Sequence, residues 1–311
     1  MLSHDTYSQP DAADPVLDEA TVCALARRHV PSASRLTGVD ESGGEARTYA
    51  IDQDVIIKTQ RPHRLRPRTS LEKEVFFLDH LASDPEIHVP SVLGYGRYGD
   101  IEYICMSRMS GVAASTLTLE GPARTKVLQD LGRTLRRIHG VPQAPFYANP
   151  LFPGVRDREE FARRVEESLG EAVAGIATVP STWTLEISPQ QLSEVALATL
   201  PPAVDIVALH SNPGPAHVFV DPETLELTGL IDFGDAYIGH PSFDWRWPRP
   251  EDRRMVLNGY EGEGALPDDF LAAWRSTMVL REMAAFASRP ASRGQALENL
   301  GWLARELELA R

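Results

Sequence analysis

The feature that most constrains the fold is a pair of short apolar segments in the C-terminal half of the chain. An apolar run, Ile206–Leu209, is followed by a polar loop and then by the strand-like segment Val218–Val220. A tight Asp-Pro-Glu-Thr turn leads into a second strand-like segment, Thr228–Asp232. Strands joined by a short turn pair side by side. We therefore expect the loop around Asn212 to lie next to Asp232.

The N-terminal third has the pattern of a sheet with one helix laid across it. Apolar residues at helical spacing predict a helix over 71–81, which Thr69 or Ser70 can cap. The connector before this helix, residues 61–68, is rich in arginine and proline. The other elements expected here are a helix over 17–28 and strands over 38–50 (with a glycine turn at 42–45), 54–58, 89–95 and 101–106.

Beyond a short hinge at 106–111 the pattern becomes helical. Helices are expected over 128–140, 158–172, 189–200, 267–287 and 295–309, interrupted by the strand pair described above. The sequence therefore predicts an α+β protein in three parts. These are a flexible tail at 1–15, a β-rich lobe at 16–110 and a mostly helical lobe at 111–311.

The charge and the cysteines exclude several classes of protein. A net charge of −13 without any basic stretch argues against a nucleic-acid partner and is compatible with a cationic substrate. No apolar run reaches the ~18 residues of a membrane span, and Met1–Pro15 lacks the basic and apolar parts of a signal peptide. Cys23 and Cys105 are too few for a disulfide framework. We expect a cytoplasmic protein without a membrane partner.

Lys58 stands out because the chain has only three lysines, the others being Lys73 and Lys126. The remaining basic residues are arginines, a bias that suggests a GC-rich bacterial source. Lys58 ends the apolar segment Val55–Ile57, and Glu74 on the following helix can pair with it. Two interpretations stand here: a solvated lysine at a strand end, and an ion pair inside a binding site.

The glycine turn at Ser42–Gly44 also has two interpretations. Gly43 and Gly44 can bring backbone N–H groups close to phosphates, because glycine lets the chain approach a ligand closely. Adjacent glycines between strands are also common in plain hairpin turns.

Together these segments resemble the aminoglycoside phosphotransferase and choline kinase family, relatives of the protein kinases. Members of that family have a catalytic loop of the form His-Gly-Asp-x-x-x-x-Asn and a metal-binding strand of the form Ile-Asp-Phe/Trp-Gly/Glu-Asp. The corresponding segments here are His210–His217 and Ile231–Asp235. The resemblance extends over about residues 30 to 290, with further matches at Lys58, Glu74, Met106–Gly111, Arg137–His139 and Gly239–Asp244.

The resemblance implies a bilobal, protein-kinase-like fold and an enzyme that transfers a phosphoryl group from ATP or GTP. The acceptor is then a hydroxyl of a small metabolite or antibiotic, and the metal is Mg²⁺ or Mn²⁺. Asp232 is the implied metal ligand, whereas His210 and Asp244 brace the loop. The implied nucleotide contacts are Lys58, Glu74, Gly43, Gly44 and Met106.

Two positions depart from the family pattern. The catalytic aspartate falls on Asn212, whose amide can orient a hydroxyl but cannot take its proton. The asparagine that serves as a second metal ligand falls on His217, and imidazole suits Mn²⁺ or Zn²⁺ better than Mg²⁺. General-base assistance contributes about 10²–10⁴-fold to a rate, so this loss slows phosphoryl transfer without forbidding it.

Three interpretations of this altered pair remain open. In the first, the protein is a phosphotransferase in which Asn212 orients the acceptor and His217, or another group, accepts the proton. In the second, it binds a nucleotide without turnover, as a pseudokinase. In the third, the cleft performs different chemistry on a small molecule. Retention of Lys58, Glu74 and Asp232 favours the interpretations in which phosphates are bound.

The remaining candidates concern the acceptor and the packing. Two acidic regions could receive amino groups of an acceptor, although a solvated helix surface explains the first as well. They comprise Asp157, Glu159, Glu160, Glu166 and Glu167 in one helix, and Glu261, Glu263, Asp268 and Asp269 in a second region. We interpret His240 as an exposed loop residue, and Trp245 and Trp247 as packing residues.

Overall fold

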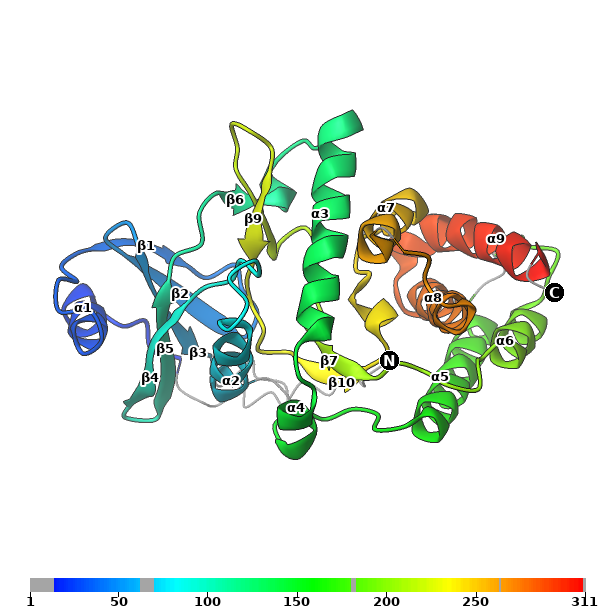
Figure 1. The fold of residues 1–311 in the computed structure, drawn as a ribbon, viewed down its shortest axis with the longest axis horizontal. Helices are drawn as coiled ribbons and strands as arrows, with labels where there is room; N and C mark the ends of the chain where they lie inside the picture. The colour runs from blue at the N-terminus through cyan, green and yellow to red at the C-terminus, as the bar shows by residue number, and fades with distance from the viewer. Residues whose placement is uncertain (1–13, 62–69, 180–182, 263, 310–311) are drawn as a thin grey trace.

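The protein is described by a computed structural model covering residues 14–61, 70–179, 183–262 and 264–309. The described chain forms two lobes, a β-rich one at the N-terminal side and a helical one at the C-terminal side (Figure 1). The start of the expected tail (residues 1–13), most of the arginine- and proline-rich connector (62–69) and Glu263 lie outside the described residues. Among the described residues, none of the helices combines the length and apolar character needed to cross a bilayer.

The N-terminal lobe is built on a five-stranded antiparallel sheet of order β1-β2-β3-β5-β4. Its strands are β1 (Leu36–Asp40), β2 (Ala46–Ile51), β3 (Val55–Gln60), β4 (Val92–Tyr98) and β5 (Ile101–Ser107). Burial alternates along β2 and β3, so that one face of each strand is in the core and the other faces the cleft between the lobes. Lys58 and Thr48 are on the cleft face.

Two helices pack on this sheet. Helix α1 (Glu19–Arg27) covers the face that carries Tyr49, Tyr103 and Cys105. Helix α2 (Leu71–Leu81) packs against β4 and β5 on the side of Ile104. The Ser70 side chain caps α2 by accepting a hydrogen bond from the Lys73 N–H, as the sequence predicts.

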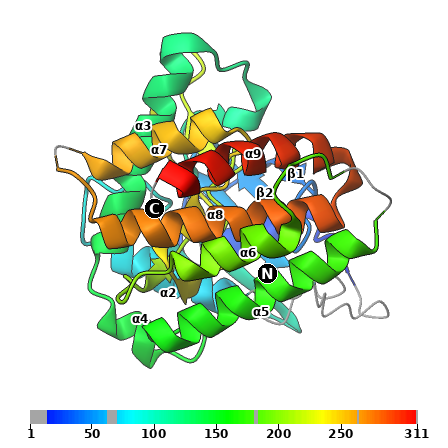
Figure 2. The same cartoon turned by 90° about the vertical axis from the view of Figure 1, so that its right-hand side faces the viewer.

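The helical lobe is organised around α8, which packs against α5, α6 and α9 (Figure 2). The helices of this lobe are α3 (Gly121–Gly140), α4 (Ala144–Ala148), α5 (Arg158–Ala177), α6 (Pro189–Ala198), α7 (Pro250–Glu261), α8 (Asp268–Ser288) and α9 (Arg293–Leu309), with short 3₁₀ turns η2 (Ala114–Thr116), η3 (Pro241–Asp244) and η4 (Pro290–Ser292). Two small antiparallel sheets lie between this lobe and the cleft. One contains β6 (Val112–Ala113), β8 (Val218–Val220) and β9 (Leu227–Leu230), and the other β7 (Val207–Leu209) and β10 (Tyr237–Gly239).

Aromatic packing joins the two lobes. Phe77 of α2 contacts Phe146 of α4, with ring centroids 4.8 Å apart, and Phe233, with centroids 5.0 Å apart. All three rings are fully buried. Because Phe233 follows Asp232 directly, this contact ties the segment that carries Asp232 to the helix that carries Glu74.

Several predictions about the elements were wrong in detail. Helix α7 was not predicted, because one proline just before it, a second at its first position and only sparse apolar residues within it resemble a loop. Strand β4 begins at Val92 rather than at residue 89. The strand expected to reach Asp232 ends at Leu230. His240 is fully buried rather than exposed, because its ring packs against Phe161 and Phe270.

Candidate active site

A cleft with a volume of about 990 Å³ lies between the lobes. The cleft-facing residues of β2 and β3 form its upper side, and the loop after β7 and the segment after β9 form its floor. The predicted site residues that line it are Lys58, Glu74, Gly43, Gly44, Met106, Asn212, His217 and Asp232. The structure therefore brings together all eight residues that the sequence singles out.

Lys58 makes the central contact of the cleft. Its Nζ donates to Glu74 Oε2 at 2.7 Å and to Asp232 Oδ1 at 2.6 Å. The side chain of Glu74 is 1% exposed and that of Lys58 13%, whereas that of Asp232 is 40% exposed. One ammonium thus connects a buried carboxylate of the N-terminal lobe with a carboxylate of the other lobe that can still reach a ligand.

These contacts settle the charge of the central pair. Burial favours the neutral form of Lys58, but the carboxylates of Asp232 and Glu74 outweigh burial and raise the pKa of the ammonium. Burial likewise would raise the pKa of Asp232, but the Lys58 ammonium dominates and holds that pKa well below its ordinary value. The cleft therefore presents a fixed cation beside a fixed anion, which suits a phosphate group and its counter-ion.

Asp232 is held in an unusual backbone conformation. Its φ is +73°, in the left-handed region that non-glycine residues seldom adopt. Its two neighbours stabilise this conformation. The Ile231 carbonyl accepts a hydrogen bond from His210 Nε2 at 2.9 Å, and Phe233 packs on the His210 ring. Strain of this kind, which costs about 1–3 kcal/mol, persists where the surrounding structure fixes it, as at functional sites.

Asp244 fixes the start of the loop between β7 and β8. This carboxylate is fully buried and accepts hydrogen bonds from the backbone N–H groups of His210 at 2.9 Å and Ser211 at 2.7 Å. It also pairs with His139 Nε2 at 3.0 Å. Ser211 has a φ of +80°, so the loop turns sharply just before Asn212. Asn212 is left exposed at the floor of the cleft.

His217 lies between Asn212 and Asp232. Its Nδ1 is 2.7 Å from the Asn212 carbonyl oxygen, and its Nε2 is 3.3 Å from Asp232 Oδ2. A carbonyl oxygen only accepts, so Nδ1 must donate. In a neutral ring the Nε2 lone pair then faces a carboxylate oxygen. A divalent cation placed between these two atoms would have one nitrogen and one oxygen ligand from the protein.

The donor set fits a divalent cation that is shared with a nucleotide. Asp232 and His217 supply one oxygen and one nitrogen, and no group of three or more His, Cys, Asp or Glu side chains within the described chain could bind a metal by itself. Mg²⁺ in such sites commonly has one or two protein ligands and takes the remaining ligands from phosphates and water. Imidazole makes Mn²⁺ a stronger candidate at His217 than Mg²⁺.

The sequence did not reveal the contacts that hold the glycine turn. Arg61 Nη1 donates to the carbonyl oxygens of Glu41 and Gly43 at 3.3 and 3.4 Å, and its Nη2 pairs with Asp14 at 3.1 Å. Asp14 also pairs with Arg47 at 3.0 Å. The end of the segment expected to be a tail is thus bound to the turn that borders the cleft. No local pattern around Asp14 signals this long-range contact.

Residues 245–247 brace the same loop as Asp244, which the sequence also did not indicate. Trp245 and Trp247 are buried, as predicted, and Trp247 Nε1 donates to the Pro213 carbonyl oxygen at 3.2 Å. Arg246 Nε donates to the Ser211 carbonyl oxygen at 2.7 Å. Backbone carbonyls on both sides of Asn212 are therefore held from one short segment.

Comparison with known proteins agrees with this geometry. A family model described as "Phosphotransferase enzyme family" matches residues 38–304. The chain belongs to this phosphotransferase family. An aminoglycoside 3'-phosphotransferase of Streptomyces ribosidificus is 30% identical over 179 residues, a match that covers 55% of this chain and 64% of that protein. A second such enzyme, from Niallia circulans, is 25% identical over 154 residues, or 54% of its length. The match thus spans less than two thirds of either relative.

Solved structures of phosphotransferases show the fold. Macrolide 2'-phosphotransferase MphH from Brachybacterium faecium matches with a TM-score of 0.59 and 21% identity, over 91% of this chain and 97% of its own. The GDP complex of wild-type aminoglycoside 2'-phosphotransferase-IIIa matches with a TM-score of 0.60 and 15% identity, over 95% of this chain and all of its own. These similarities confirm the predicted α+β, bilobal, kinase-like fold.

Proposed function

We propose that this member of the phosphotransferase family transfers the terminal phosphoryl group of ATP or GTP to a hydroxyl group of a small acceptor. The observation that carries the proposal is the Lys58 ammonium, which contacts Glu74 at 2.7 Å and Asp232 at 2.6 Å inside the cleft. A cation held in this way neutralises nucleotide phosphates, and phosphoryl transfer depends mainly on positioning and charge neutralisation.

In this proposal the nucleotide binds between the lobes. Residues 16–110 supply the upper side, with backbone N–H groups of Gly43 and Gly44 near the phosphates and Met106 at the hinge near the base. Neighbouring structures contain GDP in one case and ATP together with streptomycin in another, and this supports a purine nucleotide. Asp232 and His217 would hold a divalent cation, which neutralises the charge on the transferred phosphate.

In the transfer step, the acceptor oxygen forms a bond to the γ-phosphorus while the bond to the β,γ-bridging oxygen breaks. The side-chain oxygen of Asn212 accepts a hydrogen bond from the acceptor hydroxyl and so directs its oxygen towards phosphorus. If the cation is Mg²⁺, Asp232 would be its main protein ligand, and His217 Nε2 would take the hydroxyl proton. If it is Mn²⁺, which binds imidazole better, Nε2 would instead be a ligand and the hydroxyl proton would pass to water.

Replacing Asn212 by aspartate tests the proposal. If a missing general base limits transfer, Asn212→Asp should increase the rate by about a hundredfold, the low end of what such a base contributes. The measurement is transfer of label from γ-labelled ATP and GTP to a panel of hydroxylated acceptors. Asn258→Asp makes the same change at an exposed position on α7, and it should leave the rate unaltered.

Two outcomes would contradict the proposal. Loss of transfer in Asn212→Asp would mean that the amide has a chemical role of its own. Nucleotide binding without transfer to any acceptor, in the natural chain and in Asn212→Asp alike, would instead indicate a binding protein.

A further inference from the structure

Two arginines lie near the loop that carries Asn212, the residue that orients the acceptor in the proposed function: Arg246 contacts the loop itself, and Arg281 contacts the residue before Arg246. Arg246 Nε donates to the Ser211 carbonyl oxygen at 2.7 Å, one residue before Asn212. The Arg246 backbone is equally close, since a Cβ built on Gly214 would lie 3.7 Å from the Arg246 carbonyl oxygen and also 3.7 Å from Asn212 Oδ1. The Arg246 guanidinium therefore adjoins the same loop as the Asn212 amide.

Arg281 approaches this segment from α8. Its guanidinium donates to the carbonyl oxygen of Trp245, the residue before Arg246, and the side chain is half-buried. Burial, followed by repulsion from Arg246 and Arg253, lowers the pKa of Arg281 to about 9. The Arg281 guanidinium is thus partly withdrawn from water and has the charges of Arg246 and Arg253 near it.

Neither arginine has a carboxylate partner in the part of the chain that the structure describes. No carboxylate oxygen of these residues lies within 4.0 Å of the Arg246 or Arg281 guanidinium. Nearby arginines are different, because Arg253 pairs with Glu282 at 2.5 Å and Arg124 with Asp252 at 2.6 Å. The adjacent carboxylate, Asp244, already accepts hydrogen bonds from two backbone N–H groups and pairs with His139.

Each guanidinium therefore keeps most of its five N–H donors free of partners among the residues that the structure describes. Arg246 uses Nε and Arg281 uses one terminal nitrogen, in both cases on a backbone carbonyl. Neighbouring cations destabilise a folded chain, and arrangements that cost stability concentrate at functional sites. A planar guanidinium with free N–H groups matches the geometry of a carboxylate or a phosphate.

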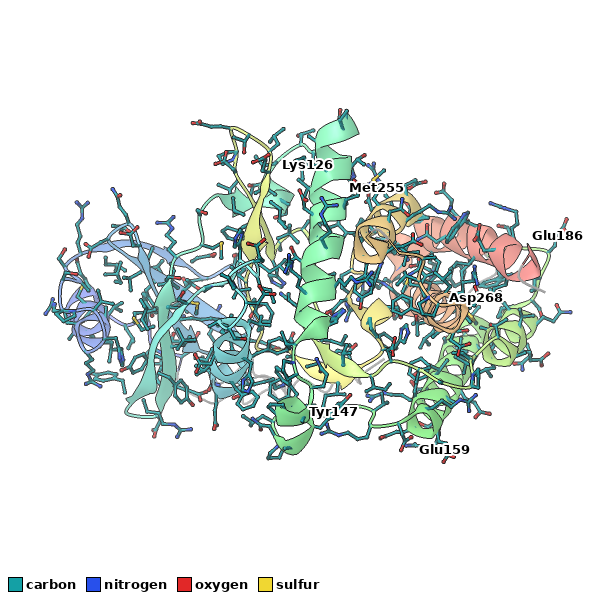
Figure 3. All side chains as sticks on the ribbon, viewed as in Figure 1. Lys126, Tyr147, Glu159, Glu186, Met255 and Asp268 are labelled. Carbon is teal, nitrogen blue, oxygen red and sulfur yellow. The ribbon has the colours of Figure 1, made fainter. Side chains whose placement is uncertain are left out.

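Several of the acidic side chains that suggested a cationic acceptor have other partners or point outward. On α5, Glu167 pairs with Arg163 at 3.0 Å, and Glu160 accepts a hydrogen bond from the Arg156 N–H. Glu159 points away from the lobe at the outer edge of α5 (Figure 3). Glu261 accepts a hydrogen bond from the Leu266 N–H.

We propose that the acceptor carries an anionic group, a carboxylate or a phosphate monoester, which binds at Arg246 and Arg281 while its hydroxyl lies at Asn212. This inference rests on the proposed function, because it assigns the substrate class of the same site. It replaces the cationic acceptor that the net charge allowed.

The test compares ligands that share one hydroxylated scaffold and differ in charge. The full-length protein, saturated with a non-hydrolysable ATP or GTP analogue, is titrated with glucuronate, glucose 6-phosphate, glucose and glucosamine, and the Kd of each is measured by ligand-observed NMR. One or both anionic sugars should bind about tenfold or more tightly than glucose, as expected for a charge-assisted hydrogen bond, and glucosamine should bind least. The two anionic sugars distinguish a carboxylate site from a phosphate site.

Substitutions then test whether Arg246 and Arg281 cause the preference for anionic sugars. Arg281→Met and Arg246→Met remove a charge while keeping an unbranched side chain, and each should reduce the preference for the anionic sugar to about that for glucose. Arg163→Met removes an exposed arginine from α5 and should leave the preference intact. The inference is overturned if glucose or glucosamine binds as tightly as both anionic sugars, or if the preference survives both substitutions. If the two variants do not fold, the order of the four sugars on the natural chain decides.

The same experiment separates this inference from the proposed function. Binding of the nucleotide analogue without any preference for anionic sugars would remove the inference alone. A preference for anionic sugars in a protein that binds neither ATP nor GTP analogues would contradict phosphoryl transfer and leave an anion-binding cleft.

Discussion

His217 stands where the family pattern has an asparagine, and it contacts two other residues of the site. Its ring is fixed at one nitrogen by the Asn212 carbonyl, at 2.7 Å, so that the other nitrogen faces Asp232 at 3.3 Å. The sequence predicted that these residues meet, because the spacing of the strands brings them together. It could not give the tautomer, since that depends on which backbone carbonyl the ring reaches.

A second histidine, His240, affects the stability of the protein at low pH. His240 is fully buried, and its Nδ1 lies 2.8 Å from the Ser242 hydroxyl oxygen and 3.3 Å from the Ser242 backbone nitrogen. Its Nε2 is a buried atom without a hydrogen-bond partner among the described residues. Burial lowers the pKa of His240 to about 3. The sequence suggested an exposed loop histidine, because the packing of Phe161 and Phe270 on the ring is not visible locally.

This lowered pKa gives the stability a pH dependence with a definite sign. Between pH 6.5 and about 3 the unfolded chain binds a proton at His240 and the folded chain does not. The free energy of unfolding therefore decreases progressively as the pH falls through that window. Each such histidine changes the unfolding equilibrium constant by about tenfold per pH unit. His240→Asn keeps a capping side chain without a titrating group and should make the decrease shallower, as measured by urea unfolding between pH 7 and 5.

Thr277→Val is the matched control for this prediction. Thr277 contacts the Ser242 side chain and carries no titratable group. Its substitution should therefore lower the free energy of unfolding by the same amount at every pH, so that the dependence on pH is unchanged. If the free energy of unfolding decreased equally steeply with falling pH in the natural chain and in His240→Asn, this prediction would be contradicted.

At the scale of elements, helices α3 and α7 meet along their backbones. A Cβ built at Gly132 of α3 would overlap the Val256 carbonyl oxygen of α7, and one built at Gly259 of α7 would overlap the Gln129 carbonyl oxygen of α3. Each helix thus places a glycine where the other passes. The sequence could not predict this pairing, because a glycine inside a helix gives no indication of its neighbour, and α7 itself did not show a clear apolar face.

Adding one methyl group at this crossing should separate the helices. Gly132→Ala and Gly259→Ala should each lower the free energy of unfolding by about 1–3 kcal/mol, the usual cost of overpacking. Gly170→Ala, in the middle of α5 with open space around it, should instead be neutral or stabilise by up to about 1 kcal/mol, since alanine favours a helix. Chemical denaturation measures all three. A neutral result at both crossing positions would mean that the helices pack less closely than described.

For the whole molecule, the two-lobe arrangement and the position of the cleft were predictable, because they follow from a few strongly patterned segments. Lys58 at the end of an apolar strand, Glu74 on a capped helix and Asp232 after a hairpin fix the relation of the lobes. The contacts of Asp14, Arg246 and Arg281 were not predictable. They join positions far apart in the chain and lack any local periodicity.

The central claim is that the cleft binds a nucleotide through the ammonium that joins its two carboxylates. Isothermal titration of ATP and GTP, with Mg²⁺ and with Mn²⁺, tests it on the natural chain, on Lys58→Met and on Lys126→Met. Lys126 is a peripheral lysine that pairs with Asp130 and Glu226 and serves as the matched control. The account predicts that the natural chain and Lys126→Met bind at least one nucleotide alike, whereas Lys58→Met binds it about tenfold or more weakly. Equal affinity in Lys58→Met, or no nucleotide binding by the natural chain, would contradict it.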